Sequence, residues 1–533
     1  MKRSIVICHL ILCSLALACN ETSSQNNVKT DTTITTQTSF NNLFTDSSTI
    51  NNFVESHPTF SEFKDQYFNF YKARNYEYAW FDTSGLAEQA HHFINLVNNT
   101  IDNLQDSSLY DASTYRLYNA FAEGNHKSKR EMIQTELSLT GLFFTYAAKV
   151  YKGSNINTAE LGWFIPRKKV DVAALLDSTL KSKNADALNF PLQHPQYKKL
   201  QEALAVYYNI QKQNIAWDSI PLPSKPLKEG HEYTAIPEIK YRLTLLGDYD
   251  GQDSSSYFDS SLLIATKRFQ KRTGLSTDGV IGAKMINELN ITPEQRIRQL
   301  LVNMERIRWM PPQEDSNYVL VNIPEYKMHV FDSGRQAFDM NVIVGKSSTG
   351  TVIFNGNLKY IVFSPYWNVP VSIVQKELLP AMKRNPNYLA KNNMEITGYS
   401  GGLPVIRQKP GESNALGLVK FLFPNNYSIY LHDTPNKELF SSPERGFSHG
   451  CIRISDARKF AQYLLRYDTV TWKPQAIDSC MHLSKEKWVT LAKTLPVYIV
   501  YFTAWVDKDG ILNFRKDIYK HDEKMIDKLF VKK

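Results

Sequence analysis

One cysteine and two histidines form the strongest chemical signal in this sequence. Cys451 follows Gly450, and His449 lies two residues earlier, so on a strand His449 and Cys451 would face the same side. His432 ends a predicted strand and is separated from Ser448 by fifteen residues, so a neighbouring strand could bring its imidazole to the sulfur. A thiolate nucleophile needs a base beside it and N–H groups facing the developing oxyanion. These residue types therefore indicate acyl transfer by a thiol.

The beginning of the chain has the pattern of an exported protein. Two basic residues precede an apolar run over 5–18, which is shorter than the roughly 20 residues of a membrane-spanning helix. We therefore expect residues 1–18 to be a signal peptide. The run ends in Ala16-Leu17-Ala18-Cys19, which fits an ordinary signal-peptidase site or a lipobox. We favour the lipobox, with lipid attached to Cys19, although Ala16 stands where such boxes usually have Leu.

A polar stretch follows, and the charge of the whole chain is only mildly positive. Ser, Thr, Asn and Gln make up 21 of the 31 residues from 20 to 50, so we expect 19–50 to be a disordered tether. The net charge of +9 on 533 residues is far from the basic stripe of a nucleic-acid binder. It suits an anionic polymer of the cell envelope, and no nucleic-acid partner is expected.

Only two of the five cysteines are expected to remain as thiols in the mature chain. Cys8 and Cys13 leave with the signal peptide, and lipidation of Cys19 leaves Cys451 and Cys480. An oxidising envelope could pair these two. A nucleophile must be a free thiolate, however, so we expect them to be unbridged.

The remaining pattern predicts a multidomain α+β chain. Helical periodicity covers 51–235, the helical scaffold, and three short helices with glycine turns fill 236–290. A connecting helix in 291–316 carries arginines expected to face solvent, namely Arg296, Arg298, Arg306 and Arg308. The period then changes to two, which predicts a strand-rich catalytic domain over 317–506. Helical segments interrupt it from about 371 to 395, within an insertion over 371–420 that we expect to fold over the site as a lid. Residues 507–533 are expected to be a C-terminal tail.

Two segments resemble known families. The unit 236–290 resembles peptidoglycan-binding domains of type 1, through Lys267-Arg268-Phe269-Gln270 and Asp278-Gly279-Val280-Ile281-Gly282. The Cys451 segment resembles the YkuD-type L,D-transpeptidases, whose signature is His, fourteen to seventeen residues, then Ser/Thr-His-Gly-Cys. One departure is Asp433, where that family usually has Gly. The flanking Pro365-Tyr366-Trp367-Asn368-Val369-Pro370 resembles the large, multidomain envelope branch of the family.

The resemblance implies a reaction and a set of roles. Cys451 would attack a tetrapeptide stem of peptidoglycan and release D-alanine, and an amine from a second stem would complete a 3→3 crosslink. Water as acceptor would instead give a carboxypeptidase. His432 would be the base, oriented by the backbone carbonyl of Asp433. His449 would shape the site, and the amides of Gly450 and Cys451 would face the oxyanion. The residues expected to bind substrate are Ser448, Arg453, Asp433, Tyr366, Trp367 and Asn368. For three of them another role stays open: a local hydrogen bond for Ser448, a structural salt bridge for Arg453 and packing for Trp367. The resemblance implies no cofactor and no metal.

Two alternatives from other classes stay open. His432, His449 and Cys451 could be zinc ligands of a hydrolase, although an imidazole and a thiolate two residues apart make an awkward chelate. The chain could also be a non-catalytic, lipid-anchored tether that binds the wall through 236–290. In each case the protein would act in the cell envelope, with peptidoglycan as its partner.

Overall fold

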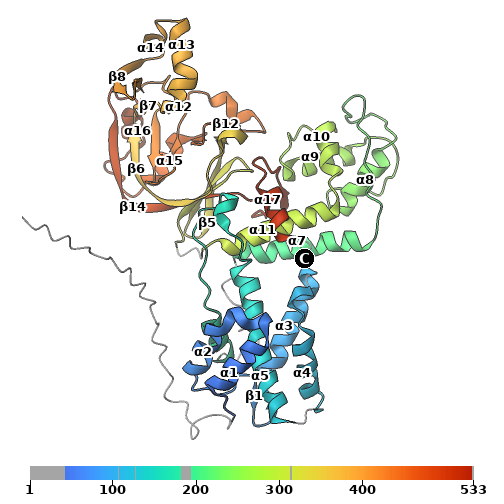
Figure 1. The fold of residues 1–533 in the computed structure, drawn as a ribbon. Coiled ribbons are helices and arrows are strands. Elements are labelled where there is room, and N and C mark those ends of the chain that lie inside the picture. Colours follow the sequence, from blue (N-terminus) through green and yellow to red (C-terminus); the bar gives the residue numbers. More distant parts are fainter. Residues whose placement is uncertain (1–42, 106, 126–127, 182–193, 312–314, 531–533) are drawn as a thin grey trace, which may run out of the picture. The chain divides into compact units, whose positions relative to one another are not determined.

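The computed structural model describes residues 43–105, 107–125, 128–181, 194–311 and 315–530 (Figure 1). The predicted signal peptide, Cys19 and most of the predicted tether lie outside these residues. The tether ends earlier than expected, because Phe44 pairs with Glu77 in a β-bridge and helix α1 (Ser47–Ser56) starts before residue 50. The chain divides into two compact units: residues up to His91 with Ala112–Leu142, and His92–Asp111 with everything from Phe143 onward.

The first unit is helical and has an aromatic core. Its elements are α1, η1 (Pro58–Phe63), α2 (Lys64–Ala73), the hairpin β1 (Phe81–Asp82) and β2 (Gly85–Leu86), α4 (Ala112–Ala122), and the first parts of α3 (Glu88–Leu104) and α5 (Lys129–Ala147). Helix α2 buries Tyr67, Phe70 and Tyr71. The buried carboxylate of Glu136 accepts hydrogen bonds from the Tyr71 hydroxyl (2.7 Å) and from the N–H groups of Ala79 (2.7 Å) and Trp80 (2.9 Å). These bonds satisfy a carboxylate that would otherwise be costly to bury.

The second unit begins with the rest of the predicted scaffold, so residues 51–235 are not one body. It contains η2 (Ser107–Leu109), η3 (Ala148–Lys152), η4 (Thr158–Leu161), α6 (Val172–Lys181) and α7 (Pro195–Lys212), and α7 packs along α11 (Pro293–Trp309). The three expected short helices are α8 (Ile236–Leu245), α9 (Ser260–Arg272) and α10 (Ala283–Leu289). They enclose a small apolar core of their own, formed among others by Leu243, Phe269 and Met285.

The expectation that the arginines of α11 face solvent is wrong for three of them. Arg308 is mostly buried and pairs with Glu305 (2.6 Å). Arg296 and Arg306 are buried and pair with Glu288 (2.6 Å) and Asp522 (2.5 Å). The carboxylates compensate the two guanidinium groups for the loss of water. Asp522 belongs to α17 (His521–Leu529), and β15 (Ala504–Val506) pairs with β16 (Leu512–Phe514). Residues 507–530, expected to be a tail, are therefore folded against the second unit.

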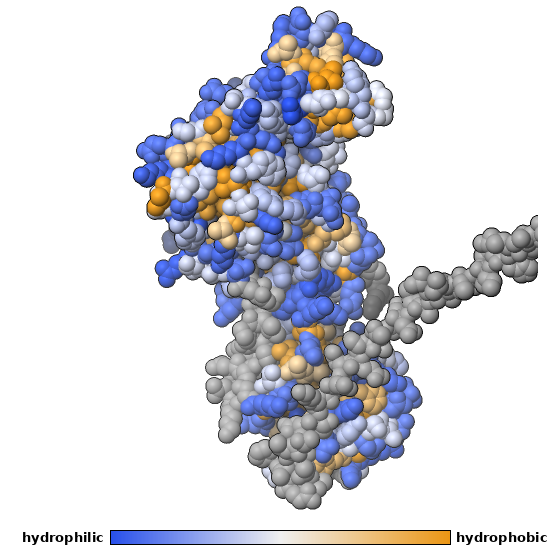
Figure 2. Space-filling model, turned by 90° about the vertical axis from the view of Figure 1, so that its left-hand side faces the viewer, coloured by the Kyte–Doolittle hydropathy of each residue, from blue (hydrophilic) through white to orange (hydrophobic). Residues whose placement is uncertain are grey.

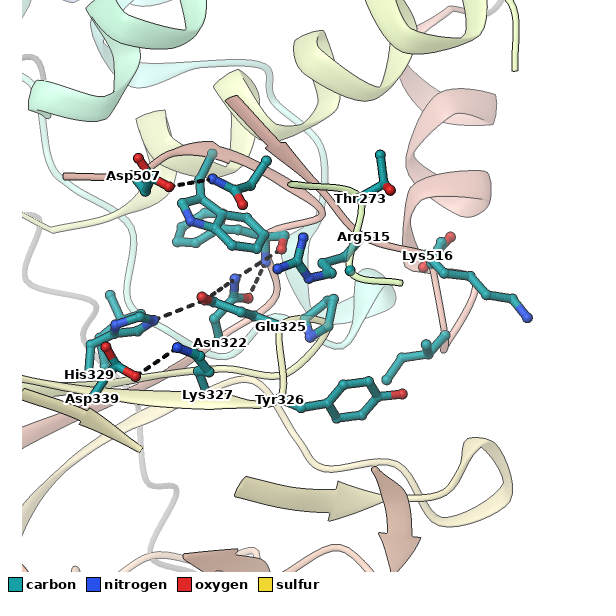
Figure 3. A pocket seen from close by; sticks show the side chains of 18 of the residues that line it. Thr273, Asn322, Glu325, Tyr326, Lys327, His329, Asp339, Asp507, Arg515 and Lys516 are labelled. Carbon is teal, nitrogen blue, oxygen red and sulfur yellow. Dashed lines mark hydrogen bonds and ion pairs between the residues drawn. The ribbon is translucent and has the colours of Figure 1, made fainter. Parts of the chain in front are cut away.

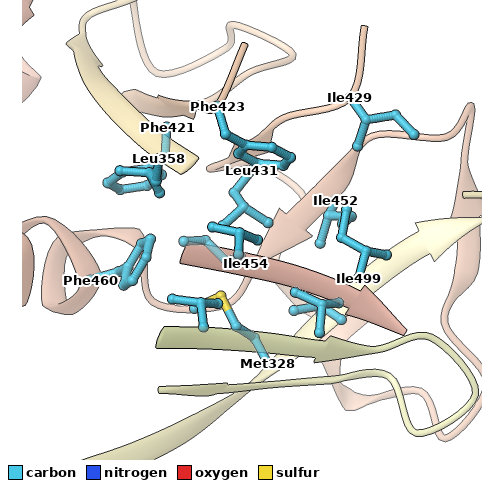
Figure 4. Close-up of a cluster of buried hydrophobic side chains, with 14 of the residues drawn as sticks. Met328, Leu358, Phe421, Phe423, Ile429, Leu431, Ile452, Ile454, Phe460 and Ile499 are labelled. Atoms are coloured by element: carbon cyan, nitrogen blue, oxygen red, sulfur yellow. The ribbon is translucent and has the colours of Figure 1, made fainter. Parts of the chain in front are cut away.

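The strand-rich domain is built on one nine-stranded sheet. Its order is β12-β5-β13-β11-β10-β6-β14-β3-β4, and an additional pairing between β4 and β5 closes the order on itself. The strands are β3 (Tyr318–Asn322), β4 (Lys327–Asp332), β5 (Arg335–Gly345), β6 (Asn355–Phe363), β10 (Val419–Leu422), β11 (Leu431–His432), β12 (Gly446–Ser448), β13 (Ile452–Ile454) and β14 (Lys487–Val500). Alternate residues point into a core that includes Phe421, Leu431, Ile452 and Ile454 (Figure 4). Helices α15 (Ala457–Leu464) and α16 (Pro474–Met481) follow β13.

Strand β11, the predicted strand that ends at His432, is only two residues long. The Asn425 side chain accepts hydrogen bonds from the N–H groups of Tyr427 (2.9 Å) and Ile429 (3.3 Å), and Ser428 has a positive φ of 56°. This local turn competes with strand pairing, so only Leu431 and His432 join the sheet.

The insertion after β7 (Trp367–Asn368) is half helical and half sheet. It starts with α12 (Val371–Ile373), η7 (Val374–Leu378), α13 (Leu379–Arg384) and α14 (Tyr388–Lys391), which match the predicted helical segments (Figure 1). A hairpin of β8 (Met394–Ser400) and β9 (Leu403–Gln408) then pairs with β7. Hydrophobic residues reach the surface near the top of Figure 2, at the height of the insertion helices, and Val371 and Tyr399 of the insertion are exposed.

Among the described residues, no helix combines the length and apolar composition that crossing a bilayer requires.

Candidate active site

The two strands that carry the predicted chemistry lie next to each other. β11 pairs in parallel with β13, which places His432 directly beside Arg453 and Leu431 beside Ile452. Leu431 and Ile452 point into the core, so His432 and Arg453 lie on the opposite face of the sheet. The strand pairing thus brings the upstream histidine to the segment that follows Cys451.

A tight turn presents Cys451. Gly450 has a φ of +119°, a conformation that L-residues with side chains rarely adopt. The Gly450 N–H donates to Ser448 Oγ (3.1 Å), and its carbonyl accepts from the hydroxyl of buried Thr351 (2.8 Å). The Gly450 amide is therefore already used and does not face an oxyanion, contrary to expectation. In the described structure the Cys451 N–H makes no hydrogen bond. Of the Gly450 and Cys451 amides, it is therefore the one that can donate to an oxyanion.

Ser448 has a local role in place of the expected contact with substrate. Its side chain is buried, and its hydroxyl donates to the Cys451 carbonyl (2.6 Å) while accepting from Gly450. The hydroxyl spans the turn and fixes the backbone on both sides of the nucleophile.

The Cys451 sulfur is partly exposed and lies beside Tyr430. Its thiol donates to the Ser428 carbonyl (3.5 Å), and the backbone and hydroxyl of Tyr430 act on it electrostatically. Burial raises the pKa of the Cys451 thiol above its ordinary value, while the Tyr430 groups act in the opposite direction. The residue pattern did not single out Tyr430. Its position two residues before His432 could have indicated it, because such residues of a strand lie on the same face. Cys451 and Cys480 are both free, as expected.

His432 is held as a neutral imidazole. Its Nδ1 donates to the Asp433 carbonyl (2.6 Å), so Nε2 is the nitrogen with an available lone pair. Burial, and then the nearby charge of Arg453, lower the pKa of His432 to about 3, although the carbonyls of Asp433 and Leu416 oppose this shift. No hydrogen bond joins this ring to Cys451 within the described residues. Catalytic hydrogen bonds are often long before substrate binds.

Asp433 holds the end of β11 and its side chain is buried. Its carboxylate accepts from the Leu418 N–H (3.0 Å) and pairs with Lys437. A Cβ on Gly417 would come within 2.5 Å of the Asp433 side chain, so Gly417 leaves the room that Asp433 requires. Asp433 thus positions His432, and a contact with substrate, as expected from the sequence, is not supported.

His449 points toward the insertion. Its Nε2 lies 3.1 Å from Glu377 Oε1, and both side chains are about half exposed. Glu377 belongs to η7, so this contact joins the segment before the nucleophile to the insertion. Sequence reasoning had no signal for Glu377.

Arg453 is a partly buried guanidinium two residues after the nucleophile. Burial lowers its pKa, and a charged Cys451 thiolate would oppose that shift. Its Nε is buried and has no hydrogen-bond partner in the described part of the chain. An unpaired donor at this place has capacity for an anionic ligand.

The three residues predicted to bind substrate before the insertion have partners of their own. Trp367 and Asn368 form β7, where Trp367 packs on the insertion core of Val369, Val374, Leu378 and Ile406. Tyr366 lies under the Arg407 guanidinium (4.2 Å). Asn368 is exposed. In the described structure no hydrogen bond, ion pair or ring contact joins any of the three to Cys451, His432 or His449, and Trp367 packs on the insertion core.

The geometry also bears on the zinc alternative. No three His, Cys, Asp or Glu side chains of the described residues come close enough to share a metal ion. His432, His449 and Cys451 therefore do not form a zinc site.

A large hollow lies elsewhere in the second unit (Figure 3). It has a volume of about 1620 Å³ and is lined by residues of α9 and α10, of β3 and β4, and of the C-terminal segment. Glu325 accepts from His329 (2.9 Å), and Lys327 pairs with Asp339 (2.7 Å) on its wall (Figure 3). Cys451 and His432 do not line it.

Three segments match models of known protein families. Residues 316–472 match YkuD, the "L,D-transpeptidase catalytic domain", and residues 65–204 match the "Scaffold domain". Residues 232–289 match the "Putative peptidoglycan binding domain". The first and third matches overlap the predicted catalytic domain and the three-helix unit.

One relative and two solved structures are similar to parts of this chain. A Haemophilus influenzae protein named "Putative L,D-transpeptidase" is 33% identical over 254 residues, which are 45% of this chain and 50% of that protein. The chain thus spans about half the length of this relative. L,D-transpeptidases from Xylanimonas cellulosilytica and Stackebrandtia nassauensis are each 14% identical, over 53% of this chain. The matches span 100% and 97% of those chains, with TM-scores of 0.18 and 0.21.

Proposed function

From a chain that carries a YkuD-type L,D-transpeptidase catalytic domain and a peptidoglycan-binding domain, we propose a cysteine transpeptidase that forms 3→3 crosslinks in peptidoglycan. The observation that carries this proposal is the neutral, buried His432 on the strand beside the segment that follows Cys451. A neutral imidazole can accept a proton, and the Asp433 carbonyl fixes which nitrogen does so.

The acylation step uses groups that are already in place. Cys451 attacks the carbonyl that precedes the terminal D-alanine of a tetrapeptide donor, and its proton passes to His432 Nε2. A C–S bond forms, and the negative charge on the carbonyl oxygen meets the Cys451 N–H. The intermediate then collapses, the C–N bond breaks, and His432 returns its proton to the departing amine of D-alanine. The Arg453 guanidinium binds the terminal carboxylate of the donor.

Deacylation decides between two products. An amine from a second stem that attacks the thioester gives the 3→3 crosslink, whereas water gives a carboxypeptidase. We propose that the insertion acts as a lid that excludes water and so favours the amine. The contact between Glu377 and His449 supports a closed position of this lid.

The test is incubation with a purified disaccharide-tetrapeptide, followed by mass spectrometry of the protein and the products. The expected results are an acyl-enzyme on Cys451, released D-alanine and crosslinked dimers. Tripeptide without dimers would indicate the carboxypeptidase. An unmodified protein and unchanged stems would leave only a wall-binding role. The Cys451→Ala variant is the control, and dimers formed by this variant would refute the cysteine mechanism.

The domains that act on peptidoglycan place the protein in the cell envelope. We further propose that Cys19 carries a lipid that anchors the mature chain. Small residues before Cys19 and the polar stretch after it support this proposal. Mass analysis of the N-terminus of the mature protein tests it, and a cleaved chain with unmodified Cys19 would refute it.

A further inference from the structure

The register of the catalytic sheet aligns five side chains on the face that carries His432. Across β14, β6, β10, β11 and β13, Trp488 is opposite Val362, Val362 opposite Lys420, Lys420 opposite His432, and His432 beside Arg453. Residues directly opposite each other on neighbouring strands point to the same face. The next residues along these strands, such as Phe421 and Val489, point into the core. This row therefore runs from His432 across β10 and β6 to Trp488 on β14, a strand inside the sheet.

Lys420 is a partly buried cation that can bind an anion. Its side chain is partly buried, and burial lowers the pKa of its ammonium group. Within the described structure no carboxylate lies at ion-pair distance from its Nζ, although the charge of Glu486 acts on it from farther away. Glu486 is occupied by two other donors, the Trp488 Nε1–H (3.0 Å) and the Tyr366 N–H (3.4 Å). A cation that has lost part of its water without gaining a partner is stabilised by an incoming carboxylate.

One aromatic ring lies beside this cation, and a second ring packs against the first. Lys420 Nζ is 5.6 Å from the centre of the Trp488 ring, and Tyr360 packs edge-on against Trp488 at 5.9 Å. The Trp488 side chain is 52% exposed although it belongs to a sheet strand. An exposed indole beside a cation offers a flat apolar surface to the aliphatic part of a ligand whose charged end reaches the ammonium.

The spacing indicates where on a donor this charge would act. Neighbouring strands are about 4.8 Å apart, so the backbones of Lys420 and Arg453 are about 10 Å apart on either side of His432. That distance equals roughly three residues of extended peptide. If Arg453 binds the terminal carboxylate of a donor, Lys420 reaches a carboxylate two or three residues upstream.

We propose that Lys420, Trp488 and Tyr360 form a subsite for a second carboxylate of the donor peptide, upstream of the bond that Cys451 attacks. The subsite rests on the proposed function, because it assumes a peptide donor in this orientation. It would select donors with a free carboxylate at that position over donors with a carboxamide.

The test compares two donors and three proteins. The donors are disaccharide-tetrapeptides that differ only in whether the carboxyl group upstream of the scissile bond is free or amidated. The proteins are the full chain, Lys420→Gln, and Lys493→Gln, which removes the same charge from an exposed position on β14. For each pair, kcat and KM of acylation are measured. Binding is measured separately by calorimetry on the Cys451→Ala form of each protein.

The expected result is a loss that depends on the donor. Lys420→Gln should raise KM and weaken binding of the free-carboxylate donor at least about tenfold, as for other hydrogen bonds to charged groups, with kcat little changed. The amidated donor should bind equally to the full chain and to Lys420→Gln. Lys493→Gln should behave as the full chain with either donor.

Two outcomes would overturn the subsite. One is an equal loss for both donors, with a shifted pH profile of kcat, because Lys420 would then act only through the charge it exerts on His432. The other is no loss at all. Failure of the proposed function gives a different pattern: no acylation of the unaltered chain by either donor, while the Cys451→Ala form still binds the free-carboxylate donor in a Lys420-dependent way.

Discussion

Replacing Gly450 by alanine tests whether the turn before Cys451 sets the rate of acylation. The φ of +119° at Gly450 lies in a region that alanine adopts only with strain. Space is not the problem, since a Cβ at Gly450 would come no closer than 3.9 Å to the Thr349 carbonyl oxygen. The entire effect of the substitution therefore arises from backbone conformation.

The size of the effect follows from that strain. A residue held in such a conformation costs about 1–3 kcal/mol. If the turn keeps its shape, the free energy of unfolding falls by this amount, and the melting temperature falls by about 2–4 °C per kcal/mol in a domain of this size. If the turn relaxes, Cys451 and its N–H move, and acylation slows by about 5- to 150-fold, since about 1.4 kcal/mol corresponds to a factor of ten. The decrease in the free energy of unfolding and the increase in the activation free energy of acylation should together equal about 1–3 kcal/mol.

The assay is the acylation rate with a tetrapeptide donor, combined with the thermal unfolding of the same preparations. Gly446→Ala is the matched control, because it adds the same atom four residues earlier. There the new Cβ would lie 3.5 Å from the Gly345 carbonyl oxygen, an ordinary contact, and φ is not positive. If Gly450→Ala were as stable and as active as the unaltered chain, the reasoning about this turn would be refuted.

Three further predictions concern the groups around the thiol. His432→Ala should slow acylation by about 10²–10⁴-fold and His449→Ala by less, measured at matched stability; a larger loss for His449→Ala would reassign the base. Because burial raises the thiol pKa and His432 is neutral, the alkylation rate of Cys451 should climb steadily from pH 6 to pH 9, and a plateau near pH 6 would reveal a preformed ion pair instead. Glu377→Gln should weaken the contact of the insertion with His449 and raise the ratio of hydrolysis to crosslinking, read by mass spectrometry, whereas an unchanged ratio would argue against a lid held by this pair.

The sequence alone was sufficient for much of the architecture. The change of hydrophobic period after residue 316 marks the start of the strands, and three short apolar patterns with glycine turns mark α8, α9 and α10. Such patterns are local, because alternation and helical spacing follow directly from backbone geometry. The motif around Cys451 likewise identified the candidate nucleophile and the upstream histidine, because the motif consists of residue types at a fixed spacing.

Other features depend on which segments meet, and only the tertiary structure decided them. The polar pattern of residues 43–50 indicated a tether, and the charges on α11 indicated a solvated face. Phe44 and Arg306 are nevertheless held by partners distant in sequence, Glu77 and Asp522. In the site the same division holds: nothing local reveals that the Thr351 hydroxyl holds the Gly450 carbonyl, or that Glu377 reaches His449. Strand register, finally, places Lys420 and Arg453 on either side of His432. Register is set by pairing between segments, so no single segment encodes that row.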